Sequence, residues 1–393
     1  MEHFSFDELT LRRHTNSYKW DLAEDDDVIP LWVADMDFPT APAVREALLR
    51  RVEHGVFGYT LVPEAFYQSA IRWFETRHGW TVDREHILYT SGVVPAISAV
   101  IQALTSPGDS VMVSTPVYNC FFSSIRNNGC RIVEHPLVYQ ADSDGEFTYS
   151  IDCDSFERTI VDQNVKLFLL CNPHNPACRV WTREELEQIG EICLRHDVVV
   201  VSDEIHGELT MPGRDYVPYA SLGGRFSREA VVCTSPSKAF NMAGLQIALI
   251  IADRDDWRQR IDKSININEV CDVNPFGVEA LMAAYDEGAE WLDALRRYLW
   301  DNYLALKDFF RHELPELSLA RLEGTYLVWV DCRHLGISSE QMEERMLKEQ
   351  KVFVNAGSMY GQAGEGFIRI NIACPRSRMM EGLKRIARFF HNL

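Results

Sequence analysis

Three features that would place this chain in large classes of protein are missing from its sequence. No apolar run approaches the roughly 20 residues of a membrane-spanning helix. The acidic N-terminal segment, residues 1–8, has no apolar stretch typical of a secretion signal. The ten cysteines show no paired C-x-x-C spacing, and Cys171 and Cys233 lie inside apolar runs, which is typical of reduced, core-filling cysteine. We therefore expect a cytoplasmic protein without membrane contact, disulfide frame or bound metal.

Positive charge is also scarce. Lys and Arg number 39 against 58 Asp and Glu, which gives a formal net charge of -19. This excess of acid argues against nucleic acids and anionic membrane surfaces as partners. We find no internal repeat, low-complexity tract or linker. The length of 393 residues predicts about two domains that share an interface, and 46% apolar residues suffice for a large core.

The middle of the chain alternates short β-branched runs with helical patterns. Such runs occur at residues 87–89, 110–113, 131–133, 165–170, 198–201, 231–232 and 247–251. Thr182 is expected to open one intervening helix through a capping box with Glu185. Strands buried on both faces that alternate with helices predict an α/β fold with a mainly parallel, seven-stranded sheet. Ligands of such sheets lie beyond the carboxyl ends of the strands.

The rest of the chain predicts a smaller α+β domain. A helical pattern runs from Pro275 to about Glu313, followed by strand-like segments at 324–331 and 367–371 and by helices that begin at Ser338 and Arg376. Residues 1–46 look mostly irregular. We predict a large domain over residues 47–285 and a small domain formed by residues 1–46 and 286–393.

One lysine lies in a turn between two apolar strands. Lys238 belongs to the segment 234–245, where Ser235, Ser237, Ala239 and Gly244 leave room beside the backbone. Such a lysine can extend its stem to solvent, which is the more common case. It can instead be held in a dry pocket, where its neutral amine is a nucleophile that forms Schiff bases. The turn alone does not decide between the two.

Charged residues at other strand ends bear on this choice. Asp203 and Glu204 end an apolar strand, where a carboxylate needs a partner. The partner can be an Arg or a helix N-terminus, or it can be the protonated ring nitrogen of pyridoxal phosphate. Arg369 lies in an apolar strand and also needs an anion, either a substrate carboxylate or an internal Asp or Glu.

Three further strand ends carry weaker signals. Asn172 and Asn175 each precede a proline, which favours plain turn chemistry for Asn172, whereas Asn175 could donate to a phenolate oxygen. The turn at 90–97 opens a helix whose N-terminus could bind a phosphate. Tyr118 could stack on a planar cofactor, although a buried Tyr more often belongs to the core.

Taken together these motifs form a familiar order. Asn-Pro-His-Asn-Pro at 172–176, Ser-Asp-Glu-Ile-His at 202–206, Ser-Pro-Ser-Lys-Ala-Phe-Asn at 235–241 and Arg-x-Asn at 369–371 follow one another. This order resembles fold-type I pyridoxal-phosphate enzymes of the class I/II aminotransferase superfamily. More narrowly, the chain resembles the MalY/PatB-type C–S lyases, which are similar to cystathionine β-lyase. The resemblance also covers segments 15–20, 32–38, 57–60 and 371–375, so it spans nearly the whole chain.

The resemblance implies a role for each matching residue. Lys238 is expected to bind pyridoxal 5'-phosphate covalently and to move the Cα proton, and Asp203 to pair with the ring nitrogen. Asn175 is expected at the phenolic oxygen, and Arg369 at the substrate carboxylate. The remaining expectations are Tyr118 stacked on the ring, Val93, Val94 and Ser235 at the phosphate, and His206 at the position where many aminotransferases carry Tyr. Tyr59 is expected to reach the active site of a neighbouring subunit, which implies a homodimer.

Two residues depart from the family pattern. Cys178 stands where the family usually has Gly in a tight turn, so the loop beside the cofactor could differ locally. Gln246 stands eight residues after Lys238, where aspartate-type aminotransferases carry a phosphate-binding Arg. The second departure fits the lyase branch, although Gln can also be an ordinary satisfied polar residue.

The implied reaction is a pyridoxal-phosphate-dependent α,β-elimination. Its substrates would be cystathionine or cysteine S-conjugates, and its products a thiol, pyruvate and ammonia. Transamination of amino acids is the alternative, because it shares the first steps. A further possibility is a pyridoxal-phosphate fold with an additional regulatory binding role.

Overall fold

The computed structural model describes residues 4–142, 145–267 and 272–393, and its centre is a seven-stranded sheet. The strand order is β2-β10-β9-β8-β7-β3-β4, and every neighbouring pair is parallel except the two that involve β10. The strands are β2 (Ile87–Thr90), β3 (Ser110–Thr115), β4 (Arg131–Pro136), β7 (Val165–Cys171), β8 (Val199–Asp203), β9 (Ala230–Thr234) and β10 (Ala248–Ile251). The predicted mainly parallel seven-stranded sheet is therefore confirmed.

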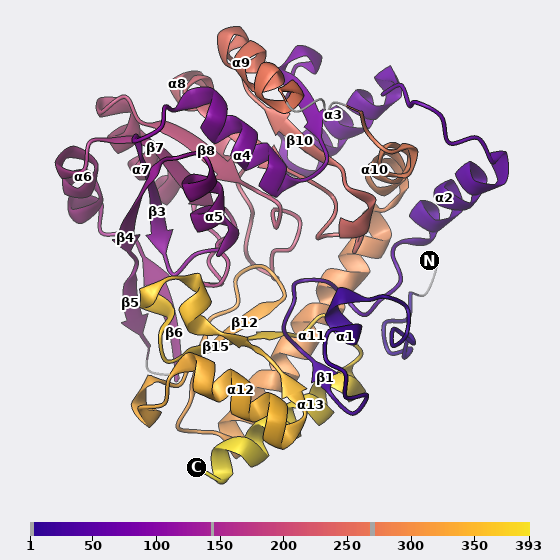
Figure 1. Ribbon diagram of the computed structural model, residues 1–393, viewed down its shortest axis with the longest axis vertical. Coiled ribbons are helices and arrows are strands. Elements are labelled where there is room, and N and C mark those ends of the chain that lie inside the picture. Colours follow the sequence, from indigo (N-terminus) through magenta and orange to yellow (C-terminus); the bar gives the residue numbers. More distant parts are fainter. Residues whose placement is uncertain (1–3, 143–144, 268–271) are drawn as a thin grey trace.

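Helices cover both faces of this sheet, as Figure 1 shows. Alternate strand residues point to opposite faces, so Val111, Leu167 and Val201 belong to one hydrophobic cluster and Met112 and Phe168 to the other. The helices of this part are α2 (Pro42–His54), α3 (Glu64–His78), α4 (Val93–Leu104), α5 (Cys120–Asn127), α6 (Cys153–Asp162), α7 (Arg183–Arg195), α8 (Gly224–Arg228), α9 (Asp255–Asn266) and α10 (Pro275–Glu287). Burial on both faces explains why the strands are continuously apolar in the sequence.

A second sheet has six strands in the order β14-β15-β12-β11-β6-β5. They are β5 (Val138–Ala141), β6 (Glu146–Ser150), β11 (Ser318–Ala320), β12 (Leu327–Asp331), β14 (Asn355–Ala356) and β15 (Phe367–Asn371). Its helices are α11 (Ala289–Glu313), α12 (Ser339–Gln350) and α13 (Arg376–His391). The sheet thus combines a hairpin from the middle of the chain with C-terminal strands. The domain boundaries drawn from the sequence stay predictions.

The helical pattern predicted from Pro275 to about Glu313 forms two helices instead of one. Helix α10 ends at Glu287 and α11 begins at Ala289, with Gly288 between them. A Cβ atom at Gly288 would collide with the Ala284 carbonyl and the Phe240 ring. The chain therefore changes direction at a glycine that allows close packing against the segment of Lys238.

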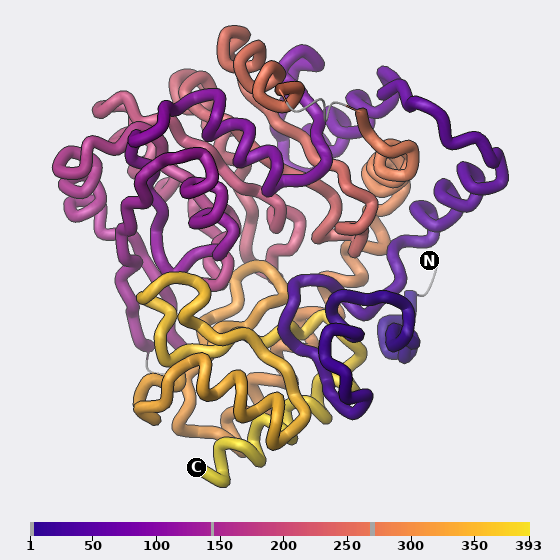
Figure 2. Tube along the Cα trace, viewed as in Figure 1, coloured from indigo at the N-terminus to yellow at the C-terminus, as the bar shows by residue number. Residues whose placement is uncertain are grey.

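The N-terminal segment lies against the C-terminal part of the chain, as the indigo and yellow tubes in Figure 2 show. After α1 (Tyr18–Asp21), strand β1 (Ile29–Pro30) pairs in parallel with β13 (Val352–Phe353). Residues 32–37 then run between the two sheets, and the Asn371 backbone donates to the Leu31 carbonyl at 2.8 Å. This route brings residues far apart in the sequence to one place. Within the described residues, no helix is both long and apolar enough to cross a membrane.

Candidate active site

Lys238 follows β9 and is half-buried in a turn fixed by serine hydrogen bonds. The Ser235 hydroxyl donates to the Ile247 carbonyl at 2.7 Å and accepts from the Ser237 backbone at 3.1 Å. Lys238 Nζ donates to the Ala34 carbonyl at 2.5 Å. Burial lowers the pKa of Lys238 to about 8. About a tenth of the amine is therefore neutral, and hence nucleophilic, at pH 7, far more than for an ordinary lysine.

Asp203 is the last residue of β8 and is buried. Its carboxylate accepts a hydrogen bond from the Ile205 backbone at 3.1 Å, and no described residue forms an ion pair with it. Burial raises the pKa of Asp203 to about 7. The arginine or helix terminus that the sequence left open as a partner is not found among the described residues. A cationic ligand atom would stabilise the ionised form.

Glu204, the next residue, has a different environment. Its carboxylate accepts from the Ser202 hydroxyl at 2.8 Å, from the Tyr219 backbone at 2.8 Å and from the Tyr216 hydroxyl. Burial nevertheless raises the pKa of Glu204 to about 7. Because neighbouring donors already satisfy this carboxylate, Asp203 is the one that can take an external partner.

Arg369 projects from β15 and is buried without a carboxylate partner among the described residues. Its guanidinium donates to the Trp32 carbonyl at 2.9 Å, to Asn355 Oδ1 at 2.7 Å and to Asn175 Oδ1 at 3.0 Å. It lies over the Tyr360 ring at 4.9 Å, and its Nε is buried without a hydrogen bond. The internal Asp or Glu considered as a partner is therefore absent from the described part of the chain.

Asn175 follows β7 within a turn whose two Asn-Pro bonds are cis. Arg369 can only donate, so the amide atom it contacts must be the oxygen. The amide nitrogen of Asn175 is consequently the atom that can donate to a ligand. Asn172 instead donates to the Val217 carbonyl at 3.0 Å, in keeping with the turn role predicted for it.

Two rings lie near these charges. Tyr118 is half-buried after β3, and burial raises the pKa of its hydroxyl, with the nearby Cys120 and Asp203 adding to the effect. His206 is buried with its Nδ1 unpartnered, and its ring meets Tyr326 edge-on at 6.1 Å between centroids. Burial, Lys238 and Arg369 together lower the pKa of His206. The imidazole is therefore neutral at physiological pH.

Helix α4 begins with the two predicted phosphate contacts. Val93 and Val94 are its first residues, and the preceding Gly92 supplies no side-chain cap. The first N–H groups of a helix have no intrahelical acceptor, and the helix dipole favours an anion there. The beginning of α4 is thus available to a phosphate.

Tyr59 does not join these residues within one chain. It lies in the loop after α2 with 98% of its side chain exposed. Further apolar side chains of the same region are also exposed, namely Leu49, Val52, Val56, Phe57 and Leu61. An aromatic ring surrounded by exposed apolar neighbours is typical of a surface that another chain covers.

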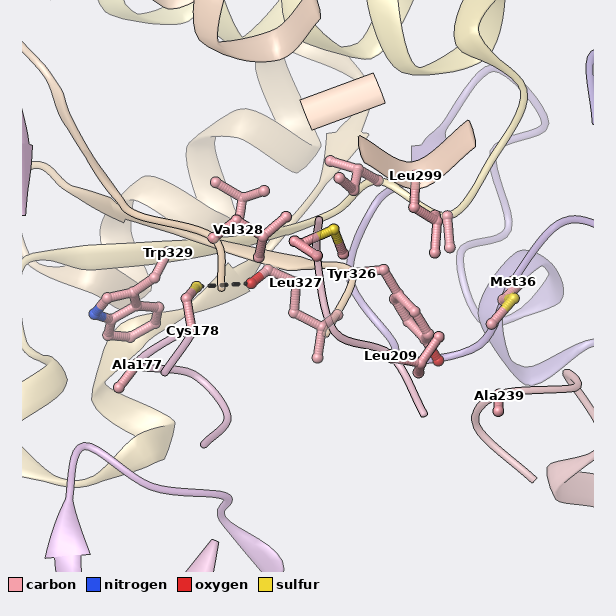
Figure 3. Packing of buried hydrophobic residues seen from close by; sticks show 14 of the residues in the cluster. Met36, Ala177, Cys178, Leu209, Ala239, Leu299, Tyr326, Leu327, Val328 and Trp329 are labelled. Carbon is pink, nitrogen blue, oxygen red and sulfur yellow. Dashed lines mark hydrogen bonds between the residues drawn. The ribbon is translucent and has the colours of Figure 1, made fainter. Parts of the chain in front are cut away.

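Cys178 preserves the tight turn in which a glycine was expected. Its φ is 61°, in the left-handed region, although the residue is fully buried. The thiol points to the Leu327 carbonyl at 3.1 Å, beside Trp329, as Figure 3 shows. The loop therefore keeps a glycine-like backbone with a cysteine in it. Gln246 also has a positive φ, of 54°, and is exposed at the end of a short 3-10 turn.

Residues 32–37 contact both Lys238 and Arg369, although no role for them was predicted from the sequence. The Ala34 carbonyl accepts from Lys238 and, at 3.0 Å, from the Tyr326 hydroxyl, and the Trp32 carbonyl accepts from Arg369. Backbone atoms of this kind carry no side-chain signal. The available hint was an apolar segment interrupted by Asp35 and Asp37. No group of His, Cys, Asp and Glu in the described ranges could hold a metal ion.

Comparison with known proteins agrees with this geometry. The family model described as aminotransferase class I and II matches residues 26–386. The chain is 42% identical to cystathionine beta-lyase PatB of Bacillus subtilis, over 97% of this chain and 98% of that protein. It is 33% identical to protein MalY of Escherichia coli, over 97% of both chains. The structure also aligns with the crystal structure of cystalysin from Treponema denticola, which contains pyridoxal 5'-phosphate. The alignment covers 100% of each chain, with a TM-score of 0.95 and 36% sequence identity.

The mainly parallel seven-stranded sheet and the match to pyridoxal-phosphate-containing structures over the whole chain place the protein among fold-type I enzymes. The chain belongs to the class I and II aminotransferase family. Within that family it is similar to PatB and MalY, as its motifs predicted. The family and fold predictions are thereby confirmed.

Proposed function

We propose that this protein is a pyridoxal-phosphate-dependent C–S β-lyase that releases a thiol, pyruvate and ammonia from cystathionine or cysteine S-conjugates. One observation carries the proposal: among the described residues, one site holds a partly neutral lysine, a carboxylate with no cation paired to it and an arginine with no carboxylate paired to it. Each lacks the partner that a bound cofactor and amino acid would supply. The lyase relatives support the same reaction.

The unmatched groups fit pyridoxal phosphate. Lys238 would hold it covalently, Asp203 would pair with its ring nitrogen, and Asn175 would donate to its phenolic oxygen. The N-terminus of α4 at Val93 and Val94, together with Ser235, would bind the phosphate. Tyr118 would stack on the ring of the cofactor. His206, whose own ring contacts Tyr326, would also lie beside the cofactor.

When bound, pyridoxal phosphate withdraws electrons from the Cα of an attached amino acid. Arg369 grips the substrate carboxylate, which fixes the orientation of the Cα–H bond. Lys238, freed when the amine of the substrate takes its place, would accept the Cα proton, and the Cβ–S bond would break with its electron pair on sulfur. The thiolate leaves and takes up a proton, and water hydrolyses the remaining enamine to pyruvate and ammonia.

We further propose a homodimer in which Tyr59 enters the partner's site. The support is its exposure of 98% together with the exposed apolar side chains around it. A side chain so exposed contributes nothing to the site of its own chain.

The direct test is incubation of the cofactor-loaded protein with L-cystathionine in the absence of any keto acid. We expect pyruvate and free thiol in equal amounts. Lys238→Ala should abolish their formation, since the variant lacks the amine proposed to hold the cofactor and to accept the Cα proton. Retained turnover in that variant would refute the role of Lys238.

Transamination is the second candidate, because the matching family model is described as an aminotransferase family. It shares proton removal by Lys238 but leaves the Cβ–S bond intact. Amino transfer that appears only when a keto acid is supplied, with no thiol release, would favour it over the lyase.

A further inference from the structure

The imidazole of His174 joins the ends of two neighbouring strands of the large sheet. Strands β3 and β7 pair in parallel, and each is followed by a turn that carries a predicted cofactor contact. Tyr118 belongs to the turn after β3, and Asn175 belongs to the turn after β7. His174 Nε2 lies 2.9 Å from the Pro116 carbonyl oxygen, two residues before Tyr118. One hydrogen bond thus connects the two turns.

The acceptor fixes the direction of this hydrogen bond. A carbonyl oxygen only accepts, so His174 Nε2 carries the proton and donates it. Burial lowers the pKa of His174 to about 4, so the ring is neutral at pH 7 and holds a single N–H group. The ring is 1% exposed and meets the Trp181 indole edge-on at 5.7 Å between centroids. The one donor of a buried ring is therefore directed at the turn of Tyr118.

The turn that contains His174 is held on its own side as well. The His174 backbone donates to the Arg179 carbonyl at 2.8 Å. Asn175, the next residue, is fixed through its side-chain oxygen, which accepts from Arg369 at 3.0 Å. His174 is accordingly part of a well-anchored turn, and the Pro116 carbonyl is the place where this turn meets the other one.

Two hydrogen bonds hold the residues that directly precede Tyr118. His174 donates to the Pro116 carbonyl, and the Val117 backbone donates to the Tyr360 carbonyl at 3.0 Å. Pro116 and Val117 are both buried. A buried carbonyl that loses its donor costs free energy, and a shift of the turn is the means of satisfying it. Loss of the imidazole would therefore displace the ring of Tyr118.

We propose that His174 is a positioning residue for the cofactor site: its Nε2–H holds the turn after β3 so that the Tyr118 ring keeps a fixed place relative to the Asn175 amide. The inference rests on the proposed function, because it takes Tyr118 and Asn175 as groups that contact the cofactor. His174 acts through these two residues and is not itself a catalytic residue.

The test compares pyridoxal 5'-phosphate binding by the full-length wild type, His174→Gln and His174→Leu. Each protein is freed of cofactor and titrated with it, and the affinity is measured together with the visible circular dichroism, which reports how the bound ring is oriented. The Gln amide can donate to the same carbonyl, whereas Leu keeps the bulk and removes the donor. We expect His174→Leu to bind the cofactor about tenfold more weakly, with lower dichroism per bound cofactor, and His174→Gln to stay within about twofold of wild type.

His135→Leu is the matched control. His135 lies on β4, on the other side of β3 from β7, and is likewise 1% exposed. Its ring meets Phe156 edge-on at 5.4 Å, and within the described residues neither ring nitrogen has a hydrogen-bond partner. This variant loses a buried imidazole that has no link to the site, so its cofactor affinity and dichroism should equal those of wild type. Equal losses in His135→Leu and His174→Leu, or wild-type behaviour of His174→Leu, would overturn the proposal.

A double variant shows whether His174 acts through Tyr118. The Tyr118→Ala protein has no ring to place, so the further change His174→Leu should weaken cofactor binding by less than about threefold. A full tenfold loss in that background would show that His174 acts independently of the ring and would contradict the proposal. If His174→Leu does not fold, as judged by urea unfolding of the cofactor-free protein, His174→Asn replaces it, because its shorter amide does not reach the Pro116 carbonyl.

These measurements separate the inference from the proposed function, because neither the affinity nor the dichroism requires cleavage of a Cβ–S bond. If wild type releases no thiol from L-cystathionine while His174→Leu binds the cofactor tenfold more weakly, the positioning role stands and the lyase is rejected. If wild type releases thiol while His174→Leu matches it in affinity and dichroism, the lyase stands and the positioning role is rejected.

Discussion

At the scale of single residues, burial sets the protonation of the active site more than ion pairing does. Burial lowers the pKa of Lys238 to about 8 and raises that of Asp203 to about 7. Both groups are thus poised near neutral pH, where a proton-transferring group is most effective. A ligand that pairs with Asp203 would move its pKa back toward the ordinary range.

Glu204 predicts a pH dependence of stability in the cofactor-free protein. Its pKa is raised from 4.5 to about 7 on folding. A raised carboxyl pKa stabilises the fold fully below the unfolded value, and this contribution is lost as the pH rises through about 7. The stability advantage of wild type over Glu204→Gln should therefore decrease by about 3 kcal/mol between pH 4.5 and pH 8.

Urea unfolding of both proteins across this pH range measures the difference. The buried histidines have lowered pKa values that oppose this trend, His174 at about 4, but they occur in both proteins and cancel. A difference that stays constant with pH would contradict the assignment to Glu204.

Cys178 offers a second prediction at this scale. For an ordinary buried residue, replacing Ala by Gly removes a methyl group and costs about 1 kcal/mol. At a φ of 61° a side chain is itself unfavourable by about 1 to 2 kcal/mol. Cys178→Gly should hence unfold at a urea concentration equal to or higher than Cys178→Ala.

Cys193 is the matched control, because it is equally buried but lies within helix α7. There the Gly variant should be less stable than the Ala variant by about 1 kcal/mol. The same order at both positions would show that the Cys178 turn carries no strain.

At the scale of elements, the sequence predicted what local rules control. All seven strands of the large sheet and the helix after Thr182 were predicted, because β-branched runs and capping boxes are local signals. The break at Gly288 was missed, since it depends on the Phe240 ring, 48 residues away in sequence. The role of residues 32–37 was missed for a similar reason: their contacts to Lys238 and Arg369 come from backbone carbonyls, which any residue possesses.

Helix α7 tests the predicted capping box directly. The Glu185 backbone donates to the Thr182 hydroxyl at 3.2 Å, and the Glu185 carboxylate accepts from the Thr182 backbone at 2.8 Å. Thr182→Ala should lower the free energy of unfolding by about 1 kcal/mol, measured by urea denaturation. Thr182→Ser, which keeps the hydroxyl, should lie close to wild type. Equal losses in both variants would exclude the cap as the cause.

At the scale of the whole molecule, some residues of the candidate site could be predicted from their own motifs and others only from a resemblance. The side chains of Lys238, Asp203, Asn175 and Arg369 could be named because their motifs occur at strand ends, and the structure places them around one site. Their roles toward the cofactor stay predictions. Tyr59 could be named from resemblance alone, since nothing within a single chain connects it to the site.

The shared-site proposal predicts complementation between inactive subunits. Lys238→Ala removes the amine of one site, and a substitution of Tyr59 to Ala weakens the site of the partner. In a mixed dimer one site would carry both defects and the other neither. Co-expression should therefore restore up to about a quarter of wild-type activity, measured as pyruvate release. Activity no higher than that of the separate variants would show that Tyr59 serves its own chain or none.

The way in which the two ends of the chain meet has a consequence for synthesis. The segment of residues 32–37 contacts Asn371, its buried Asp37 pairs with Arg378, and β1 pairs with β13. A ribosome builds the chain from the N-terminus, so residues 12–37 emerge long before the residues that hold them. The amine of Lys238 can acquire its native surroundings only once nearly the whole polypeptide has left the ribosome. Chains that stop short of Arg369 should accordingly be inert even though the large sheet is already encoded.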